Sequence, residues 1–174
     1  MRMSPGLRKL TLAVHLTVSV GWIGAVAAYM AFDFAAATGQ EAETLRNAYL
    51  AMERIAEHVI VPLAIASLVT GLAISLGTKW DLFRHYWVLI SFLLTTFATI
   101  VLLRETQVVS SYAEIAADPT TTGGGLRALP STLLHSVGGT VVLLVILVLN
   151  IYKPRGLTRY GRRMEAEERK PSAP

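Results

Sequence analysis

The amino-acid sequence predicts an all-α integral membrane protein folded as an antiparallel four-helix bundle, and three observations lead there. The chain has 174 residues, of which 53% are hydrophobic and only 16% are charged, whereas soluble domains average about 25% charged residues. Four windows, residues 10–32, 59–78, 86–103 and 128–152, contain no charged residue at all. Because a helix needs about 20 mainly apolar residues to cross a bilayer, each window can form one membrane span.

The third observation is the uneven distribution of positive charge between the two sides of such a bundle. Twelve of the 16 Lys and Arg residues lie in the N-terminal tail, in the connection between the second and third windows, and in the C-terminal tail. These three segments share one side of a four-span protein. The positive-inside rule therefore predicts that both termini are cytoplasmic. The high sequence pI of 9.6 reflects this asymmetry, so we expect the lipid bilayer as partner and no nucleic acid.

The first span is expected to begin at Ser4 and Pro5, a typical N-cap followed by a typical first helical residue. Its apolar run continues to Ala37, and Gly39 is expected to end the helix. An alternative interpretation is a signal peptide cleaved after Ala27. The apolar run is longer than the apolar region of a usual signal peptide, which favours a retained span.

The second and third spans, about residues 55–78 and 86–104, both extend beyond the bilayer at the same side. Residues 41–57 have apolar side chains at helical spacing and run without a break into the second span. Pro62 lacks an amide hydrogen and predicts a kink there. The third helix is expected to continue to about Ala117.

The rest of the chain comprises one irregular connection, the fourth span and a basic tail. Residues 118–130 are rich in Gly, Pro and Thr and predict a loop. The fourth span covers about residues 131–152. We therefore divide the chain into a membrane domain, residues 1–161, and a basic cytoplasmic tail, residues 162–174, which we expect to be disordered.

Four histidines are the residues most able to carry chemistry, because each span has one in or beside it. His58 and His135 are expected at similar depth on the side away from the termini, and His15 and His85 near the termini. Helical bundles build cofactor sites from facing side chains, and an ionisable residue in a span is a functional-site hypothesis. His15, His58 and His135 are therefore candidate ligands, whereas His85 is interpreted as an interfacial residue.

The surroundings of His58 favour a metal. Glu53 and Glu57 are spaced i, i+4, which places like charges on one helix face unless a cation lies between them. Together with His58 and His135 they could ligate copper or another transition metal. Two histidines alone could instead bind the iron of haem b, or the two glutamates could simply face water beside nearby arginines.

A family resemblance adds to these hypotheses. His15, Trp22 and Gly24 form the pattern H-x6-W-x-G within the first span. Together with residues 85–87 (HYW) and 152–156 (YKPRG), this pattern resembles the CopD and HemJ group of small bacterial membrane proteins, and in particular an uncharacterised four-span branch related to CopD. The resemblance covers about residues 10–161.

The resemblance implies a bacterial inner-membrane protein with His15 and Trp22 at a haem or metal site. CopD is implicated in copper uptake, and HemJ binds haem b and oxidises protoporphyrinogen. Residues 29–33 lack the Pro and Arg of the HemJ motif, so oxidase activity does not follow from the resemblance.

Three functions remain open from the sequence. The first is binding of haem b or a transition metal through intramembrane histidines. The second is a small copper-related transporter or permeation accessory. The third is a structural or assembly role, as a homo-oligomer or with a membrane-protein partner, through small residues on the helix faces. The absence of cysteine excludes thiolate metal sites and disulfides, and no enzyme motif points to catalysis.

Overall fold

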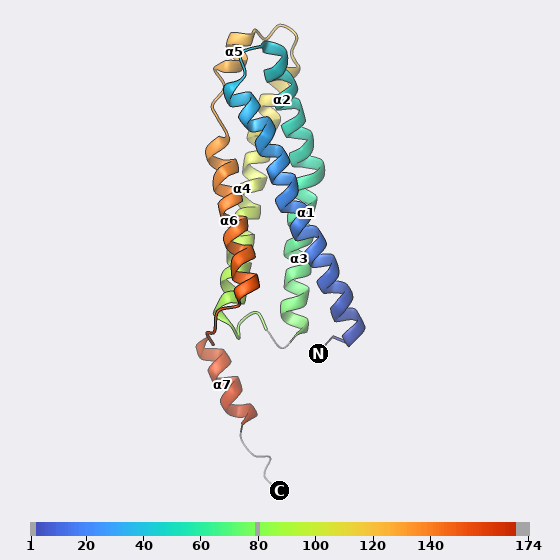
Figure 1. The fold of residues 1–174 in the computed structure, drawn as a ribbon, viewed down its shortest axis with the longest axis vertical. Coiled ribbons are helices and arrows are strands. Elements are labelled where there is room, and N and C mark those ends of the chain that lie inside the picture. Colours follow the sequence, from blue (N-terminus) through green and yellow to red (C-terminus); the bar gives the residue numbers. More distant parts are fainter. Residues whose placement is uncertain (1–2, 79–80, 170–174) are drawn as a thin grey trace.

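The chain folds into a bundle of long helices, described here from a computed structural model that covers residues 3–78 and 81–169 (Figure 1). No strand occurs among these residues, and the predicted all-α fold is confirmed. Four helical segments are long and apolar enough to cross a membrane. They are α1 (Pro5–Thr38), the continuous run α2 (Ala42–Ile55), η1 (Ala56–Ile60) and α3 (Val61–Gly77), then α4 (Tyr86–Ala117) and α6 (Leu133–Tyr152).

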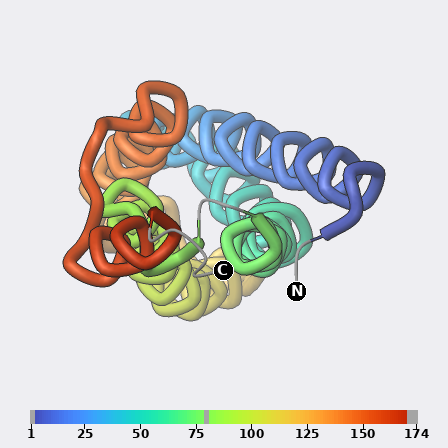
Figure 2. The backbone as a smooth tube through the Cα atoms, turned by 90° about the horizontal axis from the view of Figure 1, so that it is seen from below, coloured from blue at the N-terminus to red at the C-terminus, as the bar shows by residue number. Residues whose placement is uncertain are grey.

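The helices form a closed ring in which each one packs against two neighbours. α1 contacts the α2–α3 run and α6, and α4 contacts the same two partners from the other side. Figure 2 shows this ring along the bundle axis, with α1 leaning outward at its start. The start of α1 and the short helix α7 (Arg159–Glu168) lie at one end, called the terminal end below, and α5 (Gly123–Arg127) lies at the other, the α5 end (Figure 1).

The ends of α1 follow the predicted capping residues. The Ser4 hydroxyl accepts a hydrogen bond from the Leu7 amide, and Pro5 is the first helical residue. At the other end the Gly39 amide donates to the Ala35 carbonyl oxygen at 2.8 Å. A Cβ at Gly39 would lie 2.7 Å from that oxygen, so only glycine fits this close approach without a shift.

A π-helical turn lies directly before Pro62, where the sequence predicts a kink. The Val61 amide donates to the Ala56 carbonyl oxygen five residues earlier. Proline cannot donate to the carbonyl oxygen of His58, and the wider turn accommodates this gap without ending the helix. π-turns inside α-helices occur frequently at functional sites.

The apolar core is concentrated at the α5 end. Helix α2 contributes a fully buried stripe that includes Leu45 and Met52, and Leu126 of α5 is also fully buried. The membrane-spanning windows are different, since only 6–22% of their residues are buried inside the protein. Their exposed Leu, Ile, Val and Phe side chains match a lipid environment, as expected for a multi-pass membrane protein.

Two short helices lie where the sequence predicted irregular chain. α5 begins where the Thr122 hydroxyl accepts from the Gly125 amide, and α7 begins where the Thr158 hydroxyl accepts from the Gly161 amide. The expected disordered tail therefore forms a helix up to Glu168. Composition missed both helices because each depends on one N-cap hydroxyl. Residues 170–174 lie outside the described part of the chain.

Candidate ligand-binding cavity

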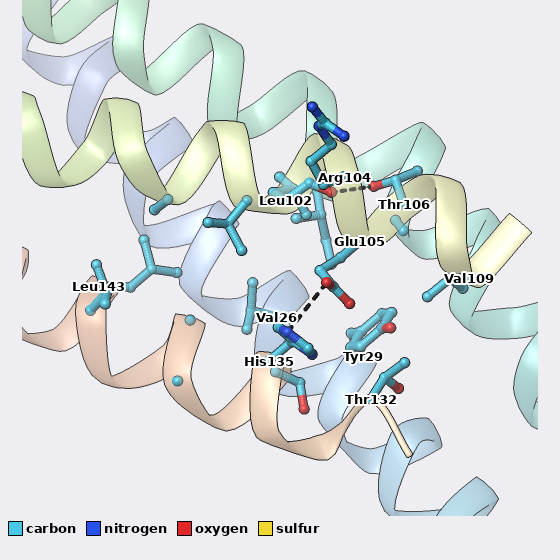
Figure 3. A pocket seen from close by; sticks show the side chains of 18 of the residues that line it. Val26, Tyr29, Leu102, Arg104, Glu105, Thr106, Val109, Thr132, His135 and Leu143 are labelled. Atoms are coloured by element: carbon cyan, nitrogen blue, oxygen red, sulfur yellow. Dashed lines mark hydrogen bonds and ion pairs between the residues drawn. The ribbon is translucent and has the colours of Figure 1, made fainter. Parts of the chain in front are cut away.

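A cavity of about 630 Å³ lies inside the bundle, lined by α1, α4, α6 and the π-turn. Its walls are mainly apolar, with Trp22 and Val26 on α1 and Ala56 and Ile60 at the π-turn. The π-turn therefore contributes directly to the shape of the cavity. Figure 3 shows the cavity from close by, with side chains of α1, α4 and α6 converging on it.

The cavity reaches the lipid-facing surface between α4 and α6. Phe97 and Ile100 of α4 and Leu134 of α6 line it, and these residues are 59%, 56% and 80% exposed. On α6, Gly138 and Gly139 also line it, and a Cβ at either position would meet no atom within 4 Å. A molecule dissolved in the bilayer can therefore approach the cavity from the side.

Its polar groups gather toward the α5 end. His135 Nε2 of α6 lies 3.4 Å from Glu105 Oε1 of α4, with 51% and 23% of the side chains exposed (Figure 3). Tyr29, Thr132 and Ser136 line the cavity nearby. A carboxylate and an imidazole next to an apolar volume can donate, accept and exchange protons with a bound molecule.

A buried carboxylate adjoins these polar groups. Asp33 of α1 is only 2% exposed. Thr132 Oγ1 donates to Asp33 Oδ1 at 2.7 Å, and Ser136 Oγ donates to Asp33 Oδ2 at 2.6 Å. Because Thr132 and Ser136 are four residues apart, they lie on one face of the first turns of α6. The pair of hydroxyls therefore satisfies both oxygens of a single carboxylate.

A second, smaller cavity of about 280 Å³ lies at the α5 end and is bordered by this carboxylate. Asp33 and Thr132 line it together with Gln40, Tyr49 and Arg127. Thr132 lines both cavities, whereas Asp33 lines the smaller one. The Asp33–Thr132 pair therefore lies between the surface of the α5 end and the large cavity.

Two of the residues proposed from the sequence, His135 and Trp22, line the large cavity. His15 does not, and lies at the contact between α1 and α3. The Thr70 hydroxyl donates to the Ala66 carbonyl oxygen at 2.6 Å, so its oxygen is the acceptor for His15 Nδ1 at 2.9 Å. The imidazole also packs over Gly71, where a Cβ would lie 3.1 Å from His15 Cε1.

The predicted outer metal site is dispersed over the bundle. His58 is exposed, and its Nδ1 donates to the Arg54 carbonyl oxygen at 3.2 Å. The Glu57 carboxylate accepts from the Ser110 hydroxyl at 2.9 Å, and neither Glu53 nor Glu57 lines the cavity that holds His135. Within residues 3–78 and 81–169, no group of three His, Asp or Glu side chains is arranged to hold a metal ion. Metal binding by these residues stays a prediction.

Sequence reasoning did not single out Glu105, and it did not pair Asp33 with hydroxyl groups of the fourth span. Both residues lie just outside charge-free windows, where they look like ordinary interfacial charges. A signal was present in the spacing, because Tyr29 and Asp33 are four apart, as are Thr132 and Ser136. Matching polar pairs on two adjacent spans indicate a polar contact between them.

No protein-family model, no curated protein and no solved structure matches the chain. The chemistry of the site therefore follows from its geometry. The arrangement provides an apolar volume open to lipid and an ionisable pair at one end. A buried carboxylate, Asp33, accepts hydrogen bonds from two other residues that line the cavity, Thr132 and Ser136.

Proposed function

We propose that this protein binds a largely apolar molecule with a hydrogen-bonding head group in the large cavity, with the head group at Glu105 and His135. The observation that carries the proposal is the 3.4 Å Glu105–His135 pair at one end of an apolar cavity of about 630 Å³. Ligand sites in proteins typically measure about 300–1,000 Å³, with apolar walls and a few placed polar groups.

The chemistry of the walls defines the class of ligand. Trp22, Val26 and Leu143 offer surface for an alkyl chain or a flat ring system. The imidazole of His135 can donate to a carbonyl oxygen, and Glu105 can accept from a hydroxyl group. A quinone with a hydrocarbon tail has this combination of properties.

Haem b, which the family resemblance implies, is a second molecule of this class to test. The cavity offers one histidine, His135, for its iron, and Nε2 of that residue is paired with Glu105. His15 and His58 lie elsewhere in the bundle, so the cavity does not provide two histidine ligands. Binding of haem b here would need Glu105 to move aside.

The orientation proposed from charge places the α5 end outside the cell. With both termini in the cytoplasm of a bacterium, the polar end of the cavity lies near the outer face of the inner membrane. The distribution of Lys and Arg supports this orientation. Labelling of single cysteines placed in α5 and in α7 with an impermeant reagent tests it, since only the former should react in intact cells.

Ligand binding can be tested on the detergent-purified protein with decylubiquinone and haem b as probes. We expect one of them to quench the fluorescence of Trp22, with the quenching lost in Trp22→Phe. Glu105→Ala should weaken binding at least about tenfold, because a hydrogen bond to a charged group contributes about 1.5–3 kcal/mol. Glu57→Ala, on an exposed glutamate outside the cavity, is the matched control and should bind normally.

The same preparation should contain a co-purified lipophilic molecule that mass spectrometry of an organic extract identifies. A preparation with no such molecule, in which neither probe quenches Trp22, would contradict the proposal. Equal weakening by Glu105→Ala and Glu57→Ala would also contradict it, since only Glu105 lines the cavity.

A further inference from the structure

Asp33 is the one carboxylate among the described residues that is buried inside the bundle. We propose that Asp33 and Thr132 form a proton relay between the surface of the α5 end and the polar end of the large cavity. The proposal rests on the proposed function and deepens it, because a relay assigns the cavity a ligand that gains or loses protons.

The first support is the position of the Asp33–Thr132 pair. The small cavity on one side of it is lined by Gln40 and Arg127, which are exposed at the α5 end. The large cavity on the other side holds Glu105 and is lined by Thr132 itself. The hydroxyl of Thr132 therefore borders both volumes and contacts the carboxylate at 2.7 Å.

The groups that surround Asp33 are mainly neutral. Helix α6 supplies two neutral hydroxyl groups, α2 supplies the phenol of Tyr49 at the small cavity, and α1 itself supplies the phenol of Tyr29 at the large cavity. Arg127 of α5 lines the same small cavity, but its guanidinium bonds the Gly123 carbonyl oxygen at 3.2 Å and Gln40 Oε1 at 3.3 Å. Within the described part of the chain, Asp33 forms no ion pair.

The transfer balances as a hydroxyl-mediated proton exchange. A proton from the small cavity adds to one Asp33 oxygen and forms the carboxylic acid. The Thr132 hydroxyl, which donates to Asp33 Oδ1 while Asp33 is a carboxylate, must then turn its proton toward the large cavity. The acid O–H passes its proton to the Thr132 oxygen as the original Thr132 hydroxyl proton leaves on that side. Glu105 accepts that proton there, through water that a polar region of this volume can hold. Asp33 returns to carboxylate, and Glu105 becomes neutral.

A purely structural hydrogen-bonded clamp between α1 and α6 is the competing explanation. Asparagine would also serve a clamp, since its amide oxygen accepts from one hydroxyl group and its NH2 group can donate to the oxygen of the other. A buried carboxylate is costly in a membrane protein, and such residues mark proton and ion pathways. The two explanations therefore differ in whether a titratable group is needed at position 33.

The experiment measures protonation of Glu105 in protein reconstituted into phosphatidylcholine vesicles, without any ligand. Infrared difference spectra are recorded after a jump from alkaline to acidic buffer, and the Glu105 carboxyl band is identified by its loss in Glu105→Gln. We expect the band to appear at least ten times more slowly in Asp33→Asn than in the native protein. Asp33→Glu, which keeps a carboxyl group, should restore most of the rate.

Thr132 provides a second test that does not depend on how well Asp33 variants fold. Thr132→Val removes the hydroxyl group and should slow the appearance of the Glu105 carboxyl band. Thr132→Ser keeps the hydroxyl group and should leave this rate unchanged. A native rate in both Asp33→Asn and Thr132→Val overturns the relay and leaves the clamp. Because no ligand is present, failure here is distinct from failure of decylubiquinone or haem b to bind.

Discussion

His15 and His135 both lie in membrane-spanning helices, yet their surroundings differ in almost every respect. His15 bonds the neutral hydroxyl of Thr70 and packs over Gly71, where even a methyl group would be tightly placed. His135 faces a cavity of about 630 Å³ and pairs with the carboxylate of Glu105. One imidazole joins two helices, and the other belongs to an open site.

The comparison teaches that histidine in a span does not by itself identify a ligand site. Glycines near each histidine determine whether its surroundings are closely packed or open. Gly71 lets α1 approach α3 closely, and the histidine fills the contact. Gly138 and Gly139 have no neighbour within 4 Å of a Cβ and leave α6 open along the cavity.

The largest expected effect is the difference in stability between two leucine variants, one at the closely packed Gly71 and one at Gly139 beside the cavity. Gly71→Leu forces a side chain into the space of the His15 imidazole and should destabilise the bundle by about 1–3 kcal/mol. Gly139→Leu should keep or raise stability, because leucine gains about 1 kcal/mol over glycine within a helix. Thermal unfolding in detergent, followed by circular dichroism, measures both.

Binding should change in the reverse order in these two variants. Gly139→Leu fills part of the large cavity and should abolish quenching of Trp22 fluorescence by decylubiquinone or haem b. Gly71→Leu lies outside the cavity and should bind normally at temperatures where it is folded. Equal stability of both variants would show that the α1–α3 contact is less tight than the structure indicates.

Alanine variants of the two histidines should also differ in their affinity for the ligand. His135→Ala should weaken binding of the same probe at least about tenfold, equivalent to about 1.4 kcal/mol, because it removes one of the two polar side chains at the head group. His15→Ala should change the affinity less than about twofold. Fluorescence titration gives both dissociation constants. A larger loss of affinity in His15→Ala than in His135→Ala would indicate that the ligand binds near His15, toward the terminal end.

A smaller effect is expected for the polar contacts that accompany His15. Ser19 Oγ and Ser67 Oγ lie 2.8 Å apart between α1 and α3, one turn from the histidine contact. Interhelical hydrogen bonds in membranes average about 0.6 kcal/mol in double-mutant cycles. A cycle with Ser19→Ala and Ser67→Ala, measured by unfolding in detergent, should give a coupling of about this size.

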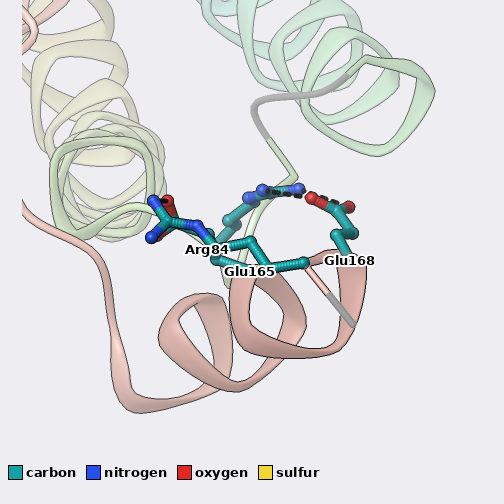
Figure 4. Close-up of polar contacts among 4 residues, drawn as sticks. Arg84, Glu165 and Glu168 are labelled. Atoms are coloured by element: carbon teal, nitrogen blue, oxygen red, sulfur yellow. Dashed lines mark hydrogen bonds and ion pairs between the residues drawn. The ribbon is translucent and has the colours of Figure 1, made fainter. Parts of the chain in front are cut away.

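The smallest effect is expected outside the membrane, at the contact between α7 and the α3–α4 connection. The Arg84 guanidinium makes two hydrogen bonds to the Glu168 carboxylate, at 3.1 and 3.0 Å (Figure 4), and this carboxylate raises the pKa of Arg84. Glu168 is 48% exposed, so Glu168→Gln should cost less than about 1 kcal/mol. Hydrogen exchange of the α7 amides should nevertheless increase, and a change in probe binding would contradict the separation of the two regions.

Most of the fold could be predicted because its signals are local. Apolar windows determined the spans, and Ser4 and Gly39 marked the beginning and the end of the first helix, which the structure confirms. At Pro62 the sequence predicted a kink, and the structure has a π-turn directly before this residue. The helix α7 could not be predicted from its charged composition, since the Thr158 cap and the Arg84–Glu168 contact hold it in place.

The site could be predicted only in part, because a cavity is a property of several helices at once. The sequence indicated His135 and Trp22 as site residues, and both line the cavity. It could not show that Glu105 faces His135, or that two α6 hydroxyls meet Asp33. Those contacts depend on helix rotation and relative height, which span boundaries uncertain by a few residues do not define.

The sequence by itself determined that four apolar helices form the protein, because the hydrophobic length and the missing charge belong to each segment alone. Only the tertiary structure decided which polar side chains meet. Each helix presents residues in all directions around its axis, and packing chooses the face that becomes the interior. That choice separates His15 in a helix contact from His135 in an open cavity.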